Sequence, residues 1–279
     1  MKIAILGSKG RLGQVLTNCL SEQGYEVVAF SRENFDVDKF LSDNQLIEAH
    51  LDVIINTIAV TDVDQCEESP LIAYKINARF PLLLARYCES KNIKLIHIST
   101  DYVFSGKNSG HYSEYSLPEP VCTYGASKLQ GEIGVLSTGN NRNLVIRTAW
   151  LFDLHKGNFL TWILGELNSH KKLIKVVADQ YGSPTSTIFL ANKITELIES
   201  DANNILHITN LGQASWYQMS QEIAVIKGFE VERLVPVSAK SLKRKAPRPF
   251  NTSLVSERNL ELTVDLSTTW TDSLRRILL

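Results

Sequence analysis

The amino terminus carries the feature that most constrains the fold: an apolar run, a glycine-rich turn and an amphipathic segment in immediate succession. Residues 2–6 are rich in strand formers and lead directly into Gly7-Ser-Lys-Gly10-Arg-Leu-Gly13. Apolar residues then recur with a helical period over 11–23. Glycines at such a turn let the backbone approach a ligand, and the helix dipole favours a pyrophosphate. The pattern predicts a dinucleotide-binding turn, and the alternative is a glycine-rich turn that binds no ligand.

The end of the second predicted strand, 25–30, bears on the choice of dinucleotide. Ser31-Arg32 stands there, where a cofactor without a 2′-phosphate usually meets an Asp or a Glu. An arginine can pair with a 2′-phosphate, whereas a carboxylate would repel it. Arg32 therefore favours NADPH, with NADH also usable. The alternative is that Arg32 is an ordinary solvated charge.

Two further segments suit the reduction of a carbonyl group by hydride. Ser99-Thr100-Asp101-Tyr102 ends an apolar run, and Tyr124-Gly-Ala-Ser-Lys128 opens a predicted helix in which residues four apart share one face. A free phenol has a pKa of about 10, and a cation beside it would lower that pKa and suit Tyr124 to protonate a developing alkoxide. A strand-end hydroxyl can hold the same oxygen. A Tyr-x-x-x-Lys pair alone also arises by chance.

Strand-like and helix-like segments alternate through the first half of the chain. This alternation predicts an α/β fold: a Rossmann-like, doubly wound parallel sheet with helices on both faces. Ligands of such sheets bind beyond the carboxyl ends of the strands, so the residues that follow the strands should converge on one crevice. The predicted strands are 2–6, 25–30, 53–57, 94–98 and 143–147, and the predicted helices are 11–23, 69–90 and 123–136.

The second half is less regular, and we interpret it as a smaller α/β substrate-binding portion. We place a dinucleotide-binding domain at 1–150 and the substrate-binding portion at 151–279, with the option that the latter returns strands to the main sheet. No repeat or low-complexity linker separates the two. The predicted helices here are 156–169, 186–199, 215–227 and 267–278, and the predicted strands are 173–177, 205–208 and 234–237.

Composition excludes several classes of partner. A net charge of -1 and a pI near 6.6 argue against nucleic acid or a membrane surface. No apolar stretch approaches the roughly 20 residues that span a bilayer, and too few residues precede Gly7 for a secretory signal, so we expect a cytoplasmic protein. The histidines show no metal-binding spacing, and no metal site is predicted. The scattered cysteines, expected to be reduced, are Cys19, Cys66, Cys88 and Cys122.

With these motifs placed, the chain resembles the extended short-chain dehydrogenase/reductases, and more narrowly the dTDP-4-dehydrorhamnose reductases. The most specific matching runs are Ser99-Thr-Asp-Tyr-Val-Phe-Ser-Gly106 and Asp179-Gln-Tyr-Gly-Ser-Pro-Thr185. The resemblance extends from residue 1 to near residue 276. Its other segments are Gly7-x-x-Gly10-x-x-Gly13, residues 56–68, Asn77-Ala78, residues 124–132, residues 147–152 and Arg248-Pro-Phe-Asn251.

The resemblance implies a reaction and a partner. The reaction is the NADPH-dependent reduction of the C4 keto group of a nucleotide-linked 4-keto-6-deoxysugar, and the partner is therefore a nucleotide-sugar substrate. The substrate nearest to the family is dTDP-4-dehydro-L-rhamnose. Its product, dTDP-L-rhamnose, is a precursor of cell-surface polysaccharide.

The implied site residues fall into three sets. The catalytic set is Thr100, Tyr124 and Lys128, and the substrate-binding set is Thr100, Asp101, Tyr102, Trp150 and Arg248. The cofactor-binding set is Gly7, Gly10, Arg11, Leu12, Gly13, Ser31, Arg32, Asp36, Val37, Ala59, Val60 and Thr61, together with Tyr124 and Lys128. Structural alternatives stay open for three residues: Trp150 as core packing, Asp179 as the cap of a loop, and Arg248 as the partner of an acidic neighbour.

Two departures from the family pattern and three rival functions remain. Val15 stands where some members carry a glutamate that helps bind magnesium at a dimer interface, so a metal-bridged dimer is not expected and a monomer or homodimer stays open. Ile58-Ala59-Val60 also departs from the family pattern.

The rival functions are a dehydratase or epimerase, a reductase of another dTDP- or UDP-linked keto sugar, and a non-catalytic subunit like that of methionine adenosyltransferase. Tyr102 occupies the place of a dehydratase's second carboxylate, which disfavours the first rival.

Overall fold

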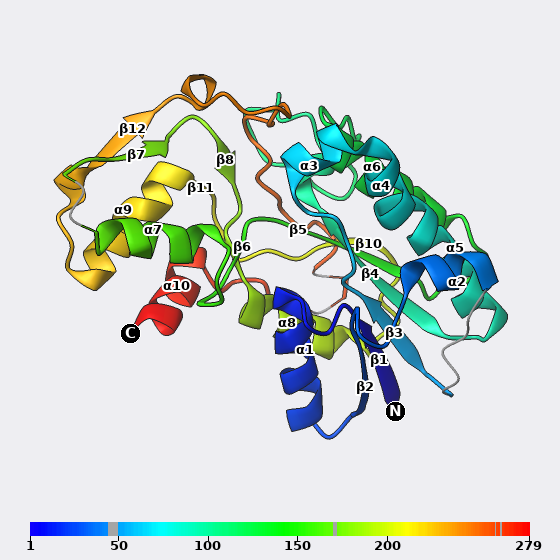
Figure 1. The fold of residues 1–279 in the computed structure, drawn as a ribbon. Helices are drawn as coiled ribbons and strands as arrows, with labels where there is room; N and C mark the ends of the chain where they lie inside the picture. Colours follow the sequence, from blue (N-terminus) through cyan, green and yellow to red (C-terminus); the bar gives the residue numbers. More distant parts are fainter. Residues whose placement is uncertain (44–49, 170–171, 260, 263) are drawn as a thin grey trace.

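A parallel six-stranded sheet forms the main body of the computed structural model, which describes residues 1–43, 50–169, 172–259, 261–262 and 264–279. The order across the sheet is β2-β1-β3-β4-β5-β10 (Figure 1). The strands are β1 (Lys2–Leu6), β2 (Glu26–Phe30), β3 (Val53–Asn56), β4 (Lys94–Thr100), β5 (Leu144–Thr148) and β10 (Asn204–His207). The predicted doubly wound parallel sheet is confirmed.

Helices cover both faces of this sheet because its strands are apolar on both sides. In β1 the alternate residues Ile3 and Ile5 join the core beneath α1 (Arg11–Glu22) and α8 (Thr187–Leu197). Ala4 and Leu6 join the opposite core. That second face is covered by α2 (Val37–Asp43), α5 (Phe80–Ser90) and α6 (Thr123–Leu136). Such near-continuous burial is typical of a parallel sheet between two helix layers.

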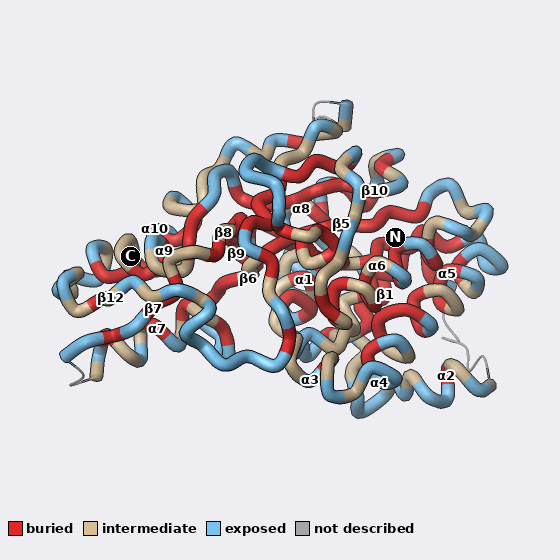
Figure 2. Tube along the Cα trace, turned by 90° about the horizontal axis from the view of Figure 1, so that it is seen from above, coloured by how far each residue is buried: buried red, intermediate tan, exposed pale blue. Residues whose placement is uncertain are grey.

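Beside the main body, part of the carboxyl-terminal half of the chain forms a second lobe. This lobe has its own apolar core, which includes Phe152, Ile163, Ile223 and Leu274. Figure 2 shows buried residues running through both lobes, with exposed residues mainly along the outer turns. The helices of the second lobe are α7 (Phe159–Leu167), α9 (Trp216–Lys227) and α10 (Trp270–Leu278). Its paired strands are β7 (Ile174–Val177) with β12 (Leu234–Val237), β8 (Tyr181–Gly182) with β11 (Ala214–Ser215), and β6 (Leu151–Phe152) with β9 (Thr185–Ser186).

The chain crosses between the two lobes more than once. After entering the second lobe it returns to the main body, where α8 packs against α1 and β10 pairs in parallel with β5. Both halves of the sequence therefore build the main sheet. The functional division that we predicted at residue 150 stays a prediction.

Several short elements lie between the predicted ones. The predicted helix 69–90 consists of α4 (Pro70–Tyr74), a π-helical segment η1 (Lys75–Arg79) and α5. Elements of a few residues show no period in the sequence, and those that we did not predict are α2, α3 (Val63–Glu68), β6, β8, β9, β11 and the 3-10 turns η2 (Asp101–Val103), η3 (Val231–Arg233) and η4 (Ala239–Ser241). Within the described ranges, no helix has the length and apolar character needed to cross a bilayer.

Candidate active site

A cavity of about 460 Å³ lies at the carboxyl ends of the central strands. It adjoins the point where the strand order reverses between β1 and β3, which is where open parallel sheets bind their ligands. The predicted site residues that line it are Gly10, Arg11, Leu12, Ala59, Thr61, Thr100, Asp101, Tyr102, Tyr124, Lys128 and Trp150. The predicted residues that do not line it are Gly7, Gly13, Ser31, Arg32, Asp36, Val37, Val60 and Arg248.

The glycine turn is built for close backbone approach. The amide N–H groups of Gly7 and Ser8 both donate to the Phe30 carbonyl, at 2.9 and 2.8 Å, which ties the turn to the end of β2. A Cβ atom on Gly13 would lie 2.2 Å from the Gly7 carbonyl oxygen, so only glycine fits there. Gly10 caps α1 without a side chain, which leaves the first amide groups of the helix facing the cavity as an anion site.

The loop after β2 places the residues predicted to contact the dinucleotide ribose. The Ser31 N–H donates to Asn34 Oδ1 at 2.7 Å, and Arg32 is exposed beside this turn. Asp36 accepts a 2.8 Å hydrogen bond from the Asp38 N–H, so its carboxylate caps the start of α2. The loop therefore offers one exposed guanidinium at the end of β2.

Tyr124 is held at the start of α6 by residues from two other elements. Glu67 of α3 accepts 2.7 Å hydrogen bonds from the amide and the hydroxyl of Thr123, which anchors the first turn of the helix. Gly125 allows α6 to lie against the backbone of Tyr102, because a Cβ atom there would be 2.1 Å from the Tyr102 carbonyl oxygen. The Tyr102 and Tyr124 rings then meet edge to face, with 5.5 Å between their centroids.

The pKa of Tyr124 moves in the opposite direction to the one expected from the sequence. Burial raises the pKa of the Tyr124 phenol, while a hydrogen bond from Thr100 acts against that rise. The expectation that the Lys128 ammonium lowers this pKa is wrong for the protein without ligands, because Lys128 is directed elsewhere. Its Nζ atom donates to the Ile98 carbonyl at 2.6 Å and lies 3.3 Å from His97 Nε2.

Lys128 itself is almost completely buried. Burial lowers the pKa of Lys128 to about 8, although the Glu132 carboxylate acts in the opposite sense. Glu132 is engaged in a buried ion pair with Arg147 at 2.6 Å. His97 was not predicted as a site residue, because a single histidine within an apolar strand carries no signal of a polar role.

Asp101 forms a second buried polar group beside the phenol. Thr100 Oγ1 donates to Asp101 Oδ1 at 3.0 Å, and the Thr252 hydroxyl donates to Asp101 Oδ2. Burial raises the pKa of Asp101 to about 6, against these hydrogen bonds. Thr252 belongs to the carboxyl-terminal region and has no local motif, so sequence reasoning missed it.

Trp150 projects into the cavity after β5 with a φ of 45°, an uncommon value for a non-glycine residue. Its ring stacks on Trp216 of α9, with 3.5 Å between the centroids and 1° between the planes. Gly182 lies against the same indole, where a Cβ atom would approach Trp150 Cε2 to 2.3 Å. The stack brings an aromatic wall from the second lobe to the cavity, and Trp216 was missed for lack of any local motif.

Arg248 and Asp179 make the structural contacts that the sequence left open. Arg248 pairs with an acidic neighbour, and Asp179 caps a loop. The Arg248 guanidinium donates to both carboxylate oxygens of Asp64, at 3.1 and 3.0 Å. Asp179 accepts from the Ser238 hydroxyl at 2.5 Å and the Ala239 amide at 2.7 Å, so it holds the loop at η4. Arg244 is a second guanidinium near Tyr102, because both Arg248 and Arg244 act to lower the pKa of that phenol against its burial.

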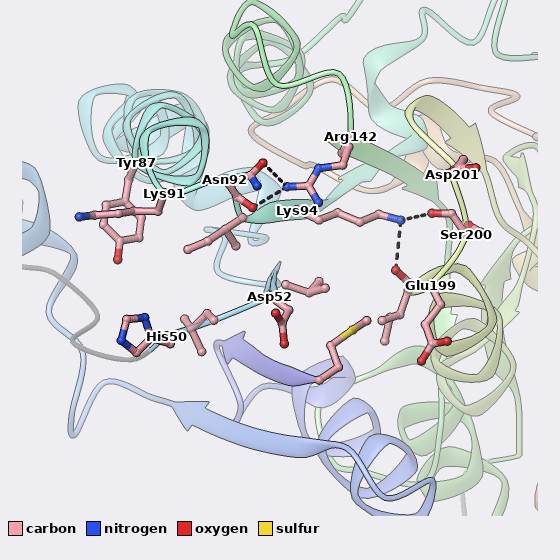
Figure 3. A pocket seen from close by; sticks show the side chains of 15 residues that line it. His50, Asp52, Tyr87, Lys91, Asn92, Lys94, Arg142, Glu199, Ser200 and Asp201 are labelled. Atoms are coloured by element: carbon pink, nitrogen blue, oxygen red, sulfur yellow. Dashed lines mark hydrogen bonds between the residues drawn. The ribbon is translucent and has the colours of Figure 1, made fainter.

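A larger cavity, of about 940 Å³, lies at the opposite ends of the strands (Figure 3). Lys94 lines this cavity. Its Nζ atom donates to three backbone carbonyls at and just after the end of α8: Leu197 at 3.0 Å, Ile198 at 3.3 Å and Ser200 at 2.7 Å. This lysine satisfies helix-terminal acceptors, which is a structural task. None of the predicted site residues lines this cavity. Within the described ranges, no cluster of three or more His, Cys, Asp or Glu residues is arranged to hold a metal ion.

The sheet, the glycine turn and the Tyr124–Lys128 pair together define an extended short-chain dehydrogenase/reductase. The chain matches the family model described as the RmlD substrate binding domain over residues 1–279, and it belongs to that family.

Relatives and solved structures agree with this assignment. A dTDP-4-keto-6-deoxy-D-glucose reductase of Streptomyces niveus is 32% identical over 90% of this chain and 87% of its own length. A dTDP-4-dehydrorhamnose reductase of Mycolicibacterium smegmatis is 33% identical over 98% of this chain and 84% of its own. The crystal structure of a dTDP-4-dehydrorhamnose reductase from Clostridium acetobutylicum superposes with a TM-score of 0.93 at 34% identity, covering 99% of this chain and 98% of that one. The Bacillus anthracis reductase in complex with NADP gives 0.92 at 30% identity over the same shares.

Proposed function

We propose that the protein reduces the C4 keto group of a nucleotide-linked 4-keto-6-deoxysugar with NADPH, and that dTDP-4-dehydro-L-rhamnose is the substrate. The observation that carries this proposal is the meeting of Thr100, Tyr124 and Lys128 in one cavity beside the glycine turn. Relatives named for this reduction match nearly the whole chain. We further propose that the enzyme works in the cytoplasm, as a monomer or a homodimer.

The glycine turn suits a dinucleotide. Its backbone amides at the start of α1 would hold the pyrophosphate. Gly13 supports this arrangement because the absence of a side chain lets α1 pack closely against the Gly7 carbonyl of the turn. Arg32, exposed at the end of β2, would pair with the 2′-phosphate. The bound cofactor supplies the hydride that adds to the sugar carbon.

Tyr124 supplies the proton in this mechanism. Because burial raises the pKa of its phenol, Tyr124 keeps its proton at neutral pH and has it available for the keto oxygen. The same dry surroundings raise the basicity of the developing alkoxide, so donor and acceptor stay matched. Thr100 would then stabilise the phenolate that remains, once its hydroxyl hydrogen turns from Asp101 Oδ1 to the Tyr124 oxygen, the contact that acts to lower the pKa of Tyr124.

The sugar nucleotide would be oriented by the second lobe. The stacked Trp150 and Trp216 rings offer a flat apolar wall to the sugar ring. Arg244, near Tyr102, would offer positive charge to the diphosphate. Arg248 would do so only by exchanging its Asp64 partner for the substrate. Binding energy from the remote nucleotide would position the small ketone for hydride transfer, so the free keto sugar should lose most of its kcat/KM.

A second candidate substrate has a specific observation in its favour. The Streptomyces niveus relative, named a dTDP-4-keto-6-deoxy-D-glucose reductase, is about as similar to this chain as the dehydrorhamnose reductases are. The two sugars differ in the configuration of ring carbons and not in the reacting ketone. A panel of dTDP- and UDP-linked 4-keto sugars therefore belongs in the test.

The test is NADPH oxidation by the purified protein with each keto sugar nucleotide, followed by identification of the reduced sugar. We expect turnover with at least one dTDP-linked 4-keto-6-deoxysugar. Tyr124→Phe should lower kcat by about 10²–10⁴-fold, whereas Tyr25→Phe, which loses only a surface contact to Glu199, should not change it. Absence of NADPH oxidation with the whole panel would refute the reductase proposal and favour a non-catalytic regulatory role.

A further inference from the structure

Three buried side chains form a line beneath the catalytic face. Asn56 ends β3, His97 lies directly opposite it in the register of β4, and Lys128 reaches the imidazole from α6. Asn56 Nδ2 lies 3.1 Å from His97 Nδ1, and Lys128 Nζ lies 3.3 Å from His97 Nε2. The exposed fractions of the three residues are 0%, 0% and 2%, so these contacts are shielded from bulk water.

The orientation of the Asn56 amide follows from a second contact. Its Oδ1 atom accepts a 3.0 Å hydrogen bond from the Ile58 backbone N–H. The other end of the amide, the Nδ2 group, therefore faces the imidazole and has only hydrogen atoms to offer. His97 Nδ1 must then accept, which means that it carries no proton.

This arrangement decides which atom of the imidazole is protonated. Burial is the main cause that lowers the pKa of His97 well below its ordinary value, and a charge on Lys128 would lower it further, so the ring is neutral in either state of the lysine. A neutral imidazole with an unprotonated Nδ1 carries its hydrogen on Nε2. That N–H points at Lys128 Nζ, and an ammonium group has no lone pair with which to accept it.

The uncharged amine of Lys128 resolves the conflict. It accepts from His97 Nε2 with its lone pair and still donates to the Ile98 carbonyl at 2.6 Å. The charged groups around Lys128 are few. On its own helix Glu132 favours the ammonium, but Arg147 of β5 pairs with that carboxylate, and Asp101 after β4 is bonded to Thr100 and Thr252.

We propose that Asn56 and His97 are positioning residues that set the protonation of Lys128: Asn56 holds His97 as the Nε2–H tautomer, and His97 favours the uncharged amine of Lys128. The proposal rests on the proposed function, since it concerns the lysine of that site. In the reduction a charged Lys128 stabilises the phenolate that Tyr124 becomes after it gives up its proton. Burial already lowers the pKa of Lys128 to about 8. The Asn56–His97 pair acts in the same direction, so it moves the loss of this charge further below the ordinary lysine pKa of about 10.4.

The first test reads the tautomer and needs no substrate. Nitrogen NMR of the full protein with 15N-labelled histidine distinguishes a protonated ring nitrogen from an unprotonated one. His97→Gln assigns the His97 signals by their loss, and the exposed His111 serves as an internal reference for a ring in contact with solvent. We expect His97 to show an unprotonated Nδ1, a protonated Nε2 and no titration through neutral pH. A protonated Nδ1 would overturn the proposal.

The second test reverses the tautomer. Asn56→Asp keeps an acceptor for the Ile58 N–H and adds an acceptor for His97 Nδ1–H, so Nε2 becomes the acceptor for a Lys128 ammonium. The Lys128 pKa, followed by 13C NMR of the labelled Cε atom and assigned with Lys128→Met, should rise by about one unit, a tenfold change in its protonation equilibrium. The alkaline limb of kcat/KM should move upward by the same amount.

A matched background separates the tautomer from the simple charge of the new carboxylate. In a His97→Phe background, Asn56→Asp acts on Lys128 by Coulomb attraction alone, so most of the pKa rise should disappear. An equal rise in both backgrounds refutes the proposal. If the double variant does not fold, the wild-type tautomer decides alone. An inactive protein with the expected tautomer and lysine pKa would contradict the proposed function and leave the Asn56–His97 assignment standing.

Discussion

The buried carboxyl of Asp101 should make folding stability fall as pH rises, the reverse of the usual effect of a carboxylate. Its pKa is raised from 3.8 in the unfolded chain to about 6 in the folded protein, with burial as the main cause. The unfolded chain therefore loses this proton at a lower pH than the folded protein does. The free energy of unfolding therefore declines between pH 3.8 and about pH 6 and is constant above that range. At neutral pH the ionised carboxylate lowers the free energy of unfolding by about 3 kcal/mol.

Asp101→Asn removes this cost because the amide does not ionise. The amide oxygen can still accept from Thr252, and any change in the bond with Thr100 adds an offset that does not vary with pH. The free energy of unfolding of both proteins is measured with urea from pH 3 to pH 8, a span chosen to bracket both pKa values. Across this span the variant should gain about 3 kcal/mol of unfolding free energy relative to wild type. The midpoint of this movement lies between 3.8 and about 6.

Asp179 provides a control of opposite sign. Although burial acts the other way, hydrogen bonds from Ser238 and Ala239 lower the pKa of Asp179 below its ordinary value. The contribution of Asp179 to the free energy of unfolding is present above the pKa of the unfolded chain and is lost as pH falls. Relative to wild type, Asp179→Asn should therefore be less stable at neutral pH than in acid. A difference between wild type and Asp101→Asn that stays constant over the whole pH range would refute the reasoning about Asp101.

Three further outcomes are expected. Arg32→Ala should raise the KM for NADPH about tenfold and leave that for NADH unchanged, as measured by steady-state kinetics; equal effects on both would remove Arg32 from the 2′-phosphate site. Gly182→Ala, whose Cβ atom would lie 2.3 Å from Trp150, should displace the indole and raise the KM for the sugar nucleotide more than that for NADPH. Thr252→Val removes a donor from the ionised Asp101 and should cost about 1–3 kcal/mol at neutral pH by urea unfolding, with a smaller loss in acid.

Elements with long, regular patterns were predictable from the sequence. The predicted helix 123–136 coincides with α6 and the predicted strand 2–6 coincides with β1, because apolar periodicity over many residues or an unbroken run of strand formers carries its own signal. The π-helical segment Lys75–Arg79 lies inside a continuous predicted helix, since a one-residue insertion into the hydrogen-bond pattern leaves the apolar period almost unchanged.

The site was predictable where its residues belong to local motifs. Thr100, Tyr124 and Lys128 were found because strand end and helix start stand close together in the sequence. His97, Trp216 and Thr252 reach the same region from separate elements and have no spacing that marks them. The direction of the Tyr124 pKa depends on burial by the folded chain, which no local pattern contains.

The return of β10 to the main sheet has a consequence for synthesis of the protein. When residue 150 leaves the ribosome, β5 still has an unpaired edge, and α1 lacks the apolar partner that α8 will supply. An exposed strand edge beside an uncovered apolar face is a template for association between chains. More than fifty further residues must therefore be made before β10 can pair with the open edge of β5. Slowing of translation within the stretch between β5 and β10 would lengthen this exposed interval and increase the need for chaperones.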